Sequence, residues 1–132
     1  MSKNIKPTES ELEILQILWE HGPSTVRFVN DILNKKRNRN QKEIGYTTTL
    51  KLMQLMHSEK GLAHRNEESR THIYTAAVHE NEMQKALLEK FVDKTFRGSA
   101  MKMVMQALGN HKTSQDELEE IKALISKLEN KK

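Results

Sequence analysis

The chain has 132 residues, of which 36% are hydrophobic and 30% are charged, and its formal net charge is +4. This length fits one domain, or one small domain with an accessory segment. The modest share of hydrophobic residues suggests that a second copy of the chain completes the core. The absence of cysteine excludes disulfides, thiolate metal sites and cysteine nucleophiles. No apolar run exceeds three residues, so we expect a cytoplasmic protein without a signal peptide or membrane insertion.

The basic residues are concentrated in the middle of the chain. Residues 34–51 hold six basic side chains against one acidic side chain, Glu43, whereas residues 113–130 hold two basic against five acidic ones. A small net charge does not by itself indicate nucleic-acid binding, so the position of the charge matters more than its sum. The uneven distribution suggests that the two parts of the chain have different tasks.

Two short helices are predicted near the start of the chain. Thr8 and Glu11 have the spacing of a capping box and open the first helix, which Gly22-Pro23 ends. Apolar residues at helical spacing then predict a second helix. The polar and basic stretch 34–45 that follows is expected to be an exposed loop.

A third helix is predicted from about Thr47 to Lys60. Four residues at helical spacing form its buried stripe, namely Thr49, Leu52, Met53 and Met56. A helix fits the major groove of DNA, and short polar side chains let its backbone approach the base edges. The candidate DNA-binding residues are therefore Tyr46, Thr47, Thr48, Lys51 and Gln54. The alternative is that the two threonines only cap the helix and that Lys51 is a solvated surface charge.

A short β-hairpin is predicted after this helix, because the period changes from 3.6 to 2 in residues 62–65 and 71–75. Three helices followed by a hairpin is the order of a winged helix-turn-helix. Arg65 and Arg70 of the hairpin and Lys42 of the preceding loop are candidates for contacts with backbone phosphates, which position a protein without reading sequence. The alternatives are cross-strand ion pairs with neighbouring glutamates and, for the loop, a solvated run of charge.

Three further helices are predicted, over residues 79–97, 99–108 and 113–130. Gly109-Asn110 is expected to end the second of them, and a capping box of Ser114 and Glu117 to open the third. Their apolar faces indicate a dimerisation region, with Leu87, Phe91, Met103, Val104, Leu108, Leu118, Ile121, Ile125 and Leu128 as candidate contacts.

The predicted fold is therefore mainly α with a small β-hairpin. It comprises an N-terminal winged helix-turn-helix for DNA binding, residues 1–78, and a C-terminal three-helix dimerisation region, residues 79–132.

Catalytic and metal chemistry find little support in the sequence. The six histidines form no dense cluster, and His64 and His72, if they face each other across the hairpin, supply at most two ligands. The chain has no glycine-rich phosphate loop, nucleophile elbow or zinc-protease motif. We therefore expect no enzyme, no metal and no cofactor.

Several stretches spread over nearly the whole chain form a familiar pattern: Thr8 to Trp19, Gly45 to Met53, Lys60 to Leu62, Ile73-Tyr74, Phe96 to Ser99 and Ser114 to Glu120. This pattern resembles the penicillinase-repressor family, BlaI/MecI/CopY, of bacterial winged-helix transcriptional regulators. The resemblance implies a homodimer that represses an operon by binding double-stranded DNA at a palindromic operator. It also implies that the third helix is the recognition helix and the hairpin is the wing.

Two departures from the family pattern change which properties of the family we expect of this chain. Copper-responsive members have a C-terminal cysteine motif, which this chain lacks, so copper sensing is not expected. In β-lactam-responsive members a membrane sensor protease triggers cleavage of an Asn-Phe bond in the middle dimerisation helix. The aligned pair here is Gln106-Ala107, within a helix that Met103, Val104 and Leu108 predict to be buried, so we expect any cleavage to use another bond.

The sequence thus predicts a homodimeric repressor of a β-lactam-resistance-type or related stress operon. The alternative is a winged-helix protein–protein adaptor without specific DNA binding. The basic segment beside the polar face of the third helix favours the repressor.

Overall fold

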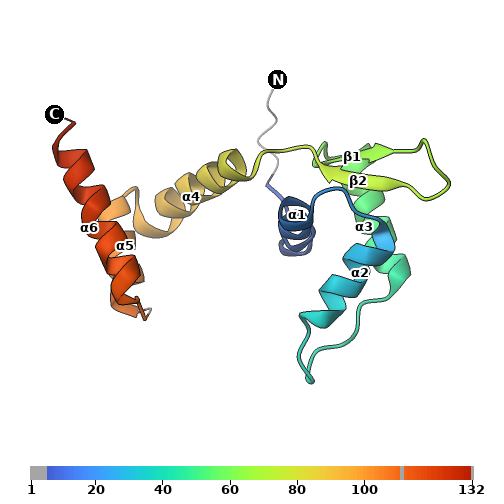
Figure 1. Cartoon of the computed structure of the whole chain (residues 1–132), viewed down its shortest axis with the longest axis horizontal. Helices are drawn as coiled ribbons and strands as arrows, with labels where there is room; N and C mark the ends of the chain where they lie inside the picture. The colour runs from blue at the N-terminus through green and yellow to red at the C-terminus, as the bar shows by residue number, and fades with distance from the viewer. Residues whose placement is uncertain (1–5, 111, 132) are drawn as a thin grey trace. The chain divides into compact units, whose positions relative to one another are not determined.

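The computed structural model of the chain describes residues 6–110 and 112–131 (Figure 1). They divide into two compact units, one ending at Leu87 and the other beginning at Leu88. The division lies within a helix and nine residues beyond residue 78, where the sequence predicts the boundary between the two domains, and that domain boundary stays a prediction. Among the described residues, no helix combines the length and apolar character needed to cross a membrane.

The first unit contains three helices, then two strands, and finally the start of a fourth helix, as Figure 1 shows. The elements are α1 (Glu9–His21), α2 (Val26–Lys35), α3 (Tyr46–Ser58), β1 (Ala63–Asn66) and β2 (Ile73–Ala76). This order confirms the predicted winged helix-turn-helix arrangement. The predicted capping box is also present, because Thr8 N donates to Glu11 Oε1 at 2.9 Å and Glu11 N donates to Thr8 Oγ1 at 3.2 Å.

The hairpin is antiparallel and is tied to the turn between α1 and α2. His64 lies opposite Thr75 in the ladder, so the arrangement considered above, in which it faces His72, does not occur. The reason is register, because the residue opposite His64 lies three positions beyond His72. On the other edge of β2, Ser24 and Tyr74 exchange two backbone hydrogen bonds of 3.0 and 2.8 Å. The hairpin is thereby held against the helices rather than projecting from a single connection.

One hydrophobic core joins the elements of the first unit. It is built from side chains of all three helices and of the hairpin: Ile14, Leu15, Ile17, Leu18, Val26, Val29, Leu33, Met53, Met56, Leu62, Ala63 and Tyr74. Each large aliphatic side chain buried in this way contributes about 1.5–3 kcal/mol relative to exposure. Trp19 packs at the edge of the core and its Nε1 donates to the carbonyl of Val78 at 2.9 Å.

An ion pair between a buried glutamate and a partly exposed lysine connects α1 with the segment that follows α3. The side chain of Glu11 is 3% exposed, and Lys60 Nζ lies 2.8 Å from its Oε2. Burial alone would raise the pKa of Glu11, but hydrogen bonds from Lys60 and Thr8 and the lysine charge outweigh it and hold the pKa below its ordinary value. The carboxylate is therefore kept charged and fully paired inside the fold.

The second unit contains the rest of α4 (Glu80–Phe96) together with α5 (Ala100–Asn110) and α6 (Gln115–Glu129). The predicted capping box of Ser114 and Glu117 is confirmed. α5 ends at Asn110, so the prediction that Gly109-Asn110 end this helix is confirmed.

The paired state of Glu11 predicts a pH dependence of stability. Because the folded pKa is lowered, the contribution of the pair is present above the ordinary carboxyl pKa and is lost as the pH falls through the folded pKa. We expect the wild type to lose more free energy of unfolding between about pH 6 and about pH 3 than Glu11→Gln does. Urea unfolding at each pH measures this difference.

Lys60→Gln is the companion variant, since it leaves the buried carboxylate without its cation. It should lower the free energy of unfolding at neutral pH by about 1–3 kcal/mol. Lys85→Gln, which removes an exposed charge, should stay close to the wild type. Equal pH dependence of the wild type and Glu11→Gln would contradict this account of the pair.

Candidate nucleic-acid interface

One face of α3 is polar and open to solvent. Thr49, Met53 and Met56 are buried on the other face, which packs into the core. The predicted contact residues lie on the open side, where all of Tyr46, Thr47, Thr48, Lys51 and Gln54 are exposed. Since i, i+3 and i+4 positions share a helix face, the buried stripe orients these side chains outward.

The beginning of α3 is not capped by a side chain. Its N-cap is Gly45, with no side-chain cap hydrogen bond, so the alternative in which Thr47 and Thr48 serve as caps is wrong. Their hydroxyl groups remain able to bind an external partner. The first turn of α3 also carries no acidic residue, so its positive dipole end is not offset locally.

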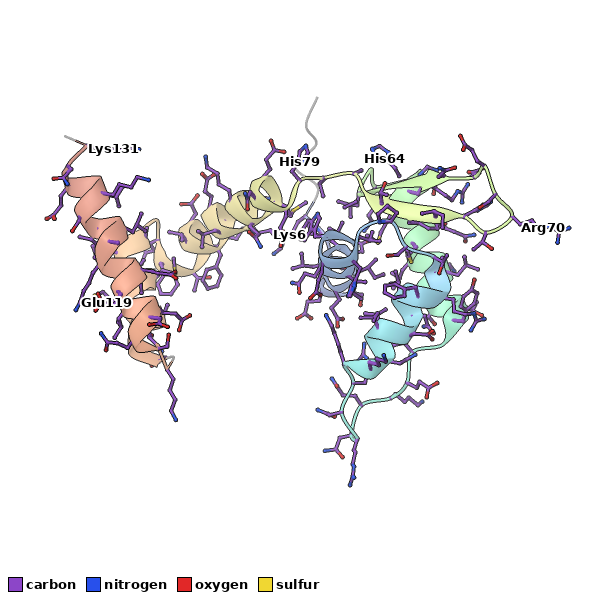
Figure 2. The ribbon with its side chains drawn as sticks, in the orientation of Figure 1. Lys6, His64, Arg70, His79, Glu119 and Lys131 are labelled. Atoms are coloured by element: carbon purple, nitrogen blue, oxygen red, sulfur yellow. The ribbon has the colours of Figure 1, made fainter. Side chains whose placement is uncertain are left out.

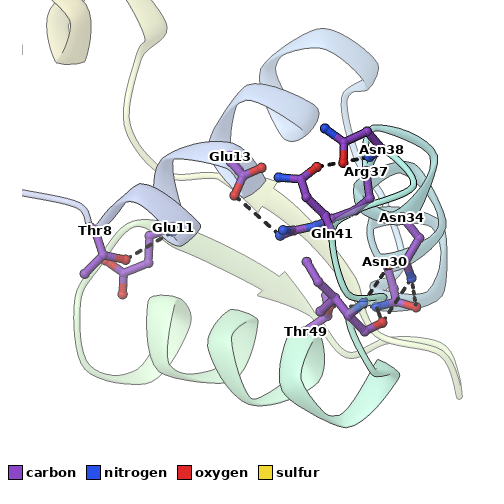
Figure 3. Close-up of polar contacts among 10 residues, drawn as sticks. Thr8, Glu11, Glu13, Asn30, Asn34, Arg37, Asn38, Gln41 and Thr49 are labelled. Carbon is purple, nitrogen blue, oxygen red and sulfur yellow. Dashed lines mark hydrogen bonds and ion pairs between the residues drawn. The ribbon is translucent and has the colours of Figure 1, made fainter.

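Two asparagines of α2 hold the start of α3 and the loop before it, as Figure 3 shows. Asn30 Nδ2 donates to Thr49 Oγ1 at 2.8 Å and to the carbonyl of Ile44 at 3.1 Å. Asn34 brackets the same residue, because its Nδ2 donates to the carbonyl of Ile44 at 3.0 Å and its Oδ1 accepts from Ile44 N at 2.7 Å. The backbone groups of Ile44, just before α3, are thus satisfied.

The sequence reasoning missed these asparagines. The available signal was the position of Asn30, four residues after Val26 and three before Leu33, which places a polar side chain on the apolar face of α2. A polar residue at a buried position needs hydrogen-bond partners, and a backbone loop is a common source of them.

The basic loop is organised by local hydrogen bonds. Asn38 N donates to Gln41 Oε1, and Asn40 N donates to Asn38 Oδ1, both at 3.0 Å. Arg37 lies 4.0 Å from Glu13 of α1, and this pair is drawn in Figure 3. Lys42 is exposed, and its contact with DNA stays a prediction.

The two arginines of the hairpin differ in their surroundings. Arg65 lies 2.6 Å from Glu67, and its guanidinium lowers the pKa of that carboxyl. The alternative of an ion pair is therefore what the structure shows for Arg65, although the partner follows β1 directly rather than lying across the hairpin. Arg70 is exposed at the hairpin tip, where Figure 2 labels it, and forms no ion pair with another described residue.

A hollow of about 480 Å³ lies where the starts of α2 and α3 meet the hairpin. It brings together two predicted residues, Tyr46 and Arg70, with one that sequence reasoning missed, Arg27. The guanidinium carbon of Arg27 lies 4.8 Å from the centroid of the Tyr46 ring, within the range of a cation–π contact. No sequence signal connects these two residues, which are far apart along the chain. Lys42 and Arg65 do not line this hollow.

The predicted dimerisation residues lie on largely uncovered apolar faces. Val92 is the one buried residue in the described parts of α4, α5 and α6. Leu87, Met103 and Ile121 are half-buried, whereas the others are exposed, namely Phe91, Val104, Leu108, Leu118, Ile125 and Leu128.

The expectation that Met103, Val104 and Leu108 lie in a buried helix is not met within a single chain. Gln106 and Ala107 of the same helix are exposed as well. The physical reason is that α5 is apolar on more than one side, and the single chain covers none of its residues fully.

No group of three or more histidine, aspartate or glutamate side chains suited to a metal ion occurs in the described ranges 6–110 and 112–131.

Residues 7–127 match the family model described as penicillinase repressor. Over all 132 residues the chain is 24% identical to a penicillinase repressor of Bacillus licheniformis, of which the match covers 98%. Methicillin resistance regulatory protein MecI is similar too, with 20% identity for the protein of Mammaliicoccus sciuri and 19% for that of Staphylococcus aureus strain N315. Both of these matches cover 96% of this chain and 98% of the relative.

Proposed function

Since this chain belongs to the penicillinase repressor family, a family of DNA-binding transcriptional repressors and not of enzymes, we propose that it acts as a homodimer at a palindromic operator. The observation that supports this most directly is the open polar face of α3, whose start is anchored by Asn30 and lies beside Arg70 of the hairpin. In this proposal the repressor works in the cytoplasm on a β-lactam-resistance-type or related stress operon.

The proposed docking places α3 in the major groove. Thr47, Thr48, Lys51 and Gln54 then contact base edges and neighbouring phosphates, in agreement with their exposure. Arg70 and Lys42 contact the backbone on either side. Arg65 contributes to DNA binding only if its guanidinium binds a phosphate in place of Glu67 or together with it.

DNA selection from a pool of random duplexes tests the proposal. We expect enrichment of a sequence with two inverted half-sites, because a two-fold symmetric dimer presents α3 twice. Lys51→Ala should weaken binding to that sequence by about 1–3 kcal/mol and relax the preference at one position of each half-site. Fluorescence anisotropy measures the affinities, with Lys85→Ala as a control that removes an exposed charge outside the proposed interface.

A failure of the wild type to bind any duplex in a salt-dependent way would sink the repressor proposal. The protein–protein adaptor would then be the better interpretation of the fold.

The dimer is proposed from the uncovered apolar faces of the second unit. Ile125 is 51% exposed and Leu128 56% exposed, on a helix whose opposite side is charged. Apolar area of this kind gains about 25 cal/mol per Å² when it is removed from water. A second copy supplies the same faces by two-fold symmetry, so each chain covers the other.

Replacing Ile121 and Ile125 together by Asp should abolish the dimer, because the interface would have to bury unpaired carboxylates. Light scattering should give the mass of two chains for the wild type and of one chain for the variant. The matched control replaces Ala123 and Ser126 by Asp, which adds the same charge to α6 outside the apolar stripe. A variant that keeps the wild-type mass would show that this stripe is not the interface.

We propose that the repressor is not released by cleavage between Gln106 and Ala107, the pair that aligns with the cleaved bond of β-lactam-responsive family members. If a membrane sensor protease triggers cleavage, a small side chain at Ala107 forfeits about 2–3 kcal/mol of the burial that an aromatic side chain would gain in an apolar pocket. We therefore expect mass spectrometry of the repressor from cells exposed to a β-lactam to show no fragment ending at Gln106. Such a fragment would refute this expectation.

A further inference from the structure

We infer that the hollow between α2, α3 and the hairpin binds a backbone phosphate of DNA, with Arg27, held against Tyr46, as its main anion-binding group. This inference rests on the proposed function and adds a phosphate contact on α2 to the recognition helix and the wing.

The chemistry of the hollow is that of an anion site. Arg27 and Arg70 supply two guanidinium groups, and Thr25 and Thr71 lie beside them. None of the described residues that line the hollow is acidic. An uncompensated pair of arginines with neighbouring hydroxyl groups suits a phosphodiester, which accepts several hydrogen bonds and carries one negative charge.

Arg27 is prepared for this contact before DNA arrives. Its guanidinium carbon lies 4.8 Å from the centroid of the Tyr46 ring, so part of its side-chain freedom is already restricted. Stacking on a ring leaves the in-plane N–H donors of a guanidinium available for a bidentate contact. Arg27 forms no ion pair with another described residue, unlike Arg65, whose charge is compensated by Glu67.

The position of the hollow connects it with the proposed recognition face. Tyr46 is the first residue of α3 and directly precedes Thr47. The first residue of α2, Val26, lines the same hollow, and neither helix has an acidic residue in its first turn. The positive dipole ends of α2 and α3 therefore add to the arginines at one place.

The size of the hollow favours DNA backbone over a free ion. A volume of about 480 Å³ is far larger than one phosphate needs, so a sugar–phosphate segment fits where a single anion would be loosely held. A phosphate bound there would place the strand next to Thr47 at the entry of α3 into the groove.

The test uses the full chain and a short duplex of arbitrary sequence, since phosphate contacts do not depend on base sequence. The salt dependence of binding is measured by fluorescence anisotropy for the wild type and for Arg27→Gln. We expect the slope of log K against log salt to become less steep by about 0.9 for each hollow that loses its phosphate. Lys85→Gln, which removes an exposed charge outside the hollow, should keep the wild-type slope.

Further variants separate charge from stacking. Arg27→Lys should keep most of the slope but bind more weakly, because an ammonium neither stacks nor binds in a bidentate way. Tyr46→Leu, which removes the ring, should bind more weakly than Tyr46→Phe, which keeps it. Circular dichroism of each variant confirms the fold, which we expect to persist because Arg27 is exposed.

An unchanged slope in Arg27→Gln would overturn the inference while leaving the proposed function intact. Absence of salt-dependent duplex binding by the wild type would overturn both. A titration with inorganic phosphate, followed by the Arg27 side-chain NMR signal, addresses the other source of the same chemistry. A strong response to phosphate together with a wild-type slope in Arg27→Gln would assign the hollow to a free anion and overturn the inference.

Discussion

The buried side chain of Asn30 is the constraint on which the interface depends. Its amide nitrogen donates to the Thr49 hydroxyl and to the carbonyl of Ile44, and it is 7% exposed. A buried amide that loses a partner costs about 1–3 kcal/mol, so this arrangement of loop and helix is strongly preferred over its alternatives. It sets where α3 begins, and therefore where Tyr46 meets Arg27 and which residues of the next turn face outward. The hydrogen bonds of Asn30 to the loop and to α3 thus determine the geometry of the open polar face of α3.

The two units complete their cores in different ways. The first unit closes its core with side chains from every element, and even the charge of Glu11 is paired inside it. The second unit leaves large apolar side chains such as Phe91 and Ile125 about half exposed. A single chain gains little from ordering such helices, because the burial that should offset their conformational entropy is missing. Their apolar pattern makes sense when the folded state includes another copy, and stability then depends on concentration.

Local features were predictable from sequence and distant contacts were not. The capping boxes at Thr8 and Ser114 depend on residues three positions apart, and the stripe of α3 depends on helical spacing, so both could be derived from the order of residues. The Glu11–Lys60 pair and the Arg27–Tyr46 contact join residues on different elements, which no periodicity connects. The strand register differs by three residues from one that would pair His64 with His72, because alternation in short polar strands indicates their existence better than their ends.

The charge of the proposed DNA-facing surface cannot be judged by counting basic residues, and the hairpin shows why. Arg65 already has a counter-charge in Glu67, 2.6 Å away, whereas Arg27 and Arg70 have no acidic partner among the described residues. When a phosphate takes the place of Glu67, the freed carboxylate lies beside a polyanion and attracts cations again, so fewer counterions are released overall. An arginine without a partner carries no such cost. Arg27 and Arg70 should therefore contribute more to the salt dependence of binding than Arg65 does.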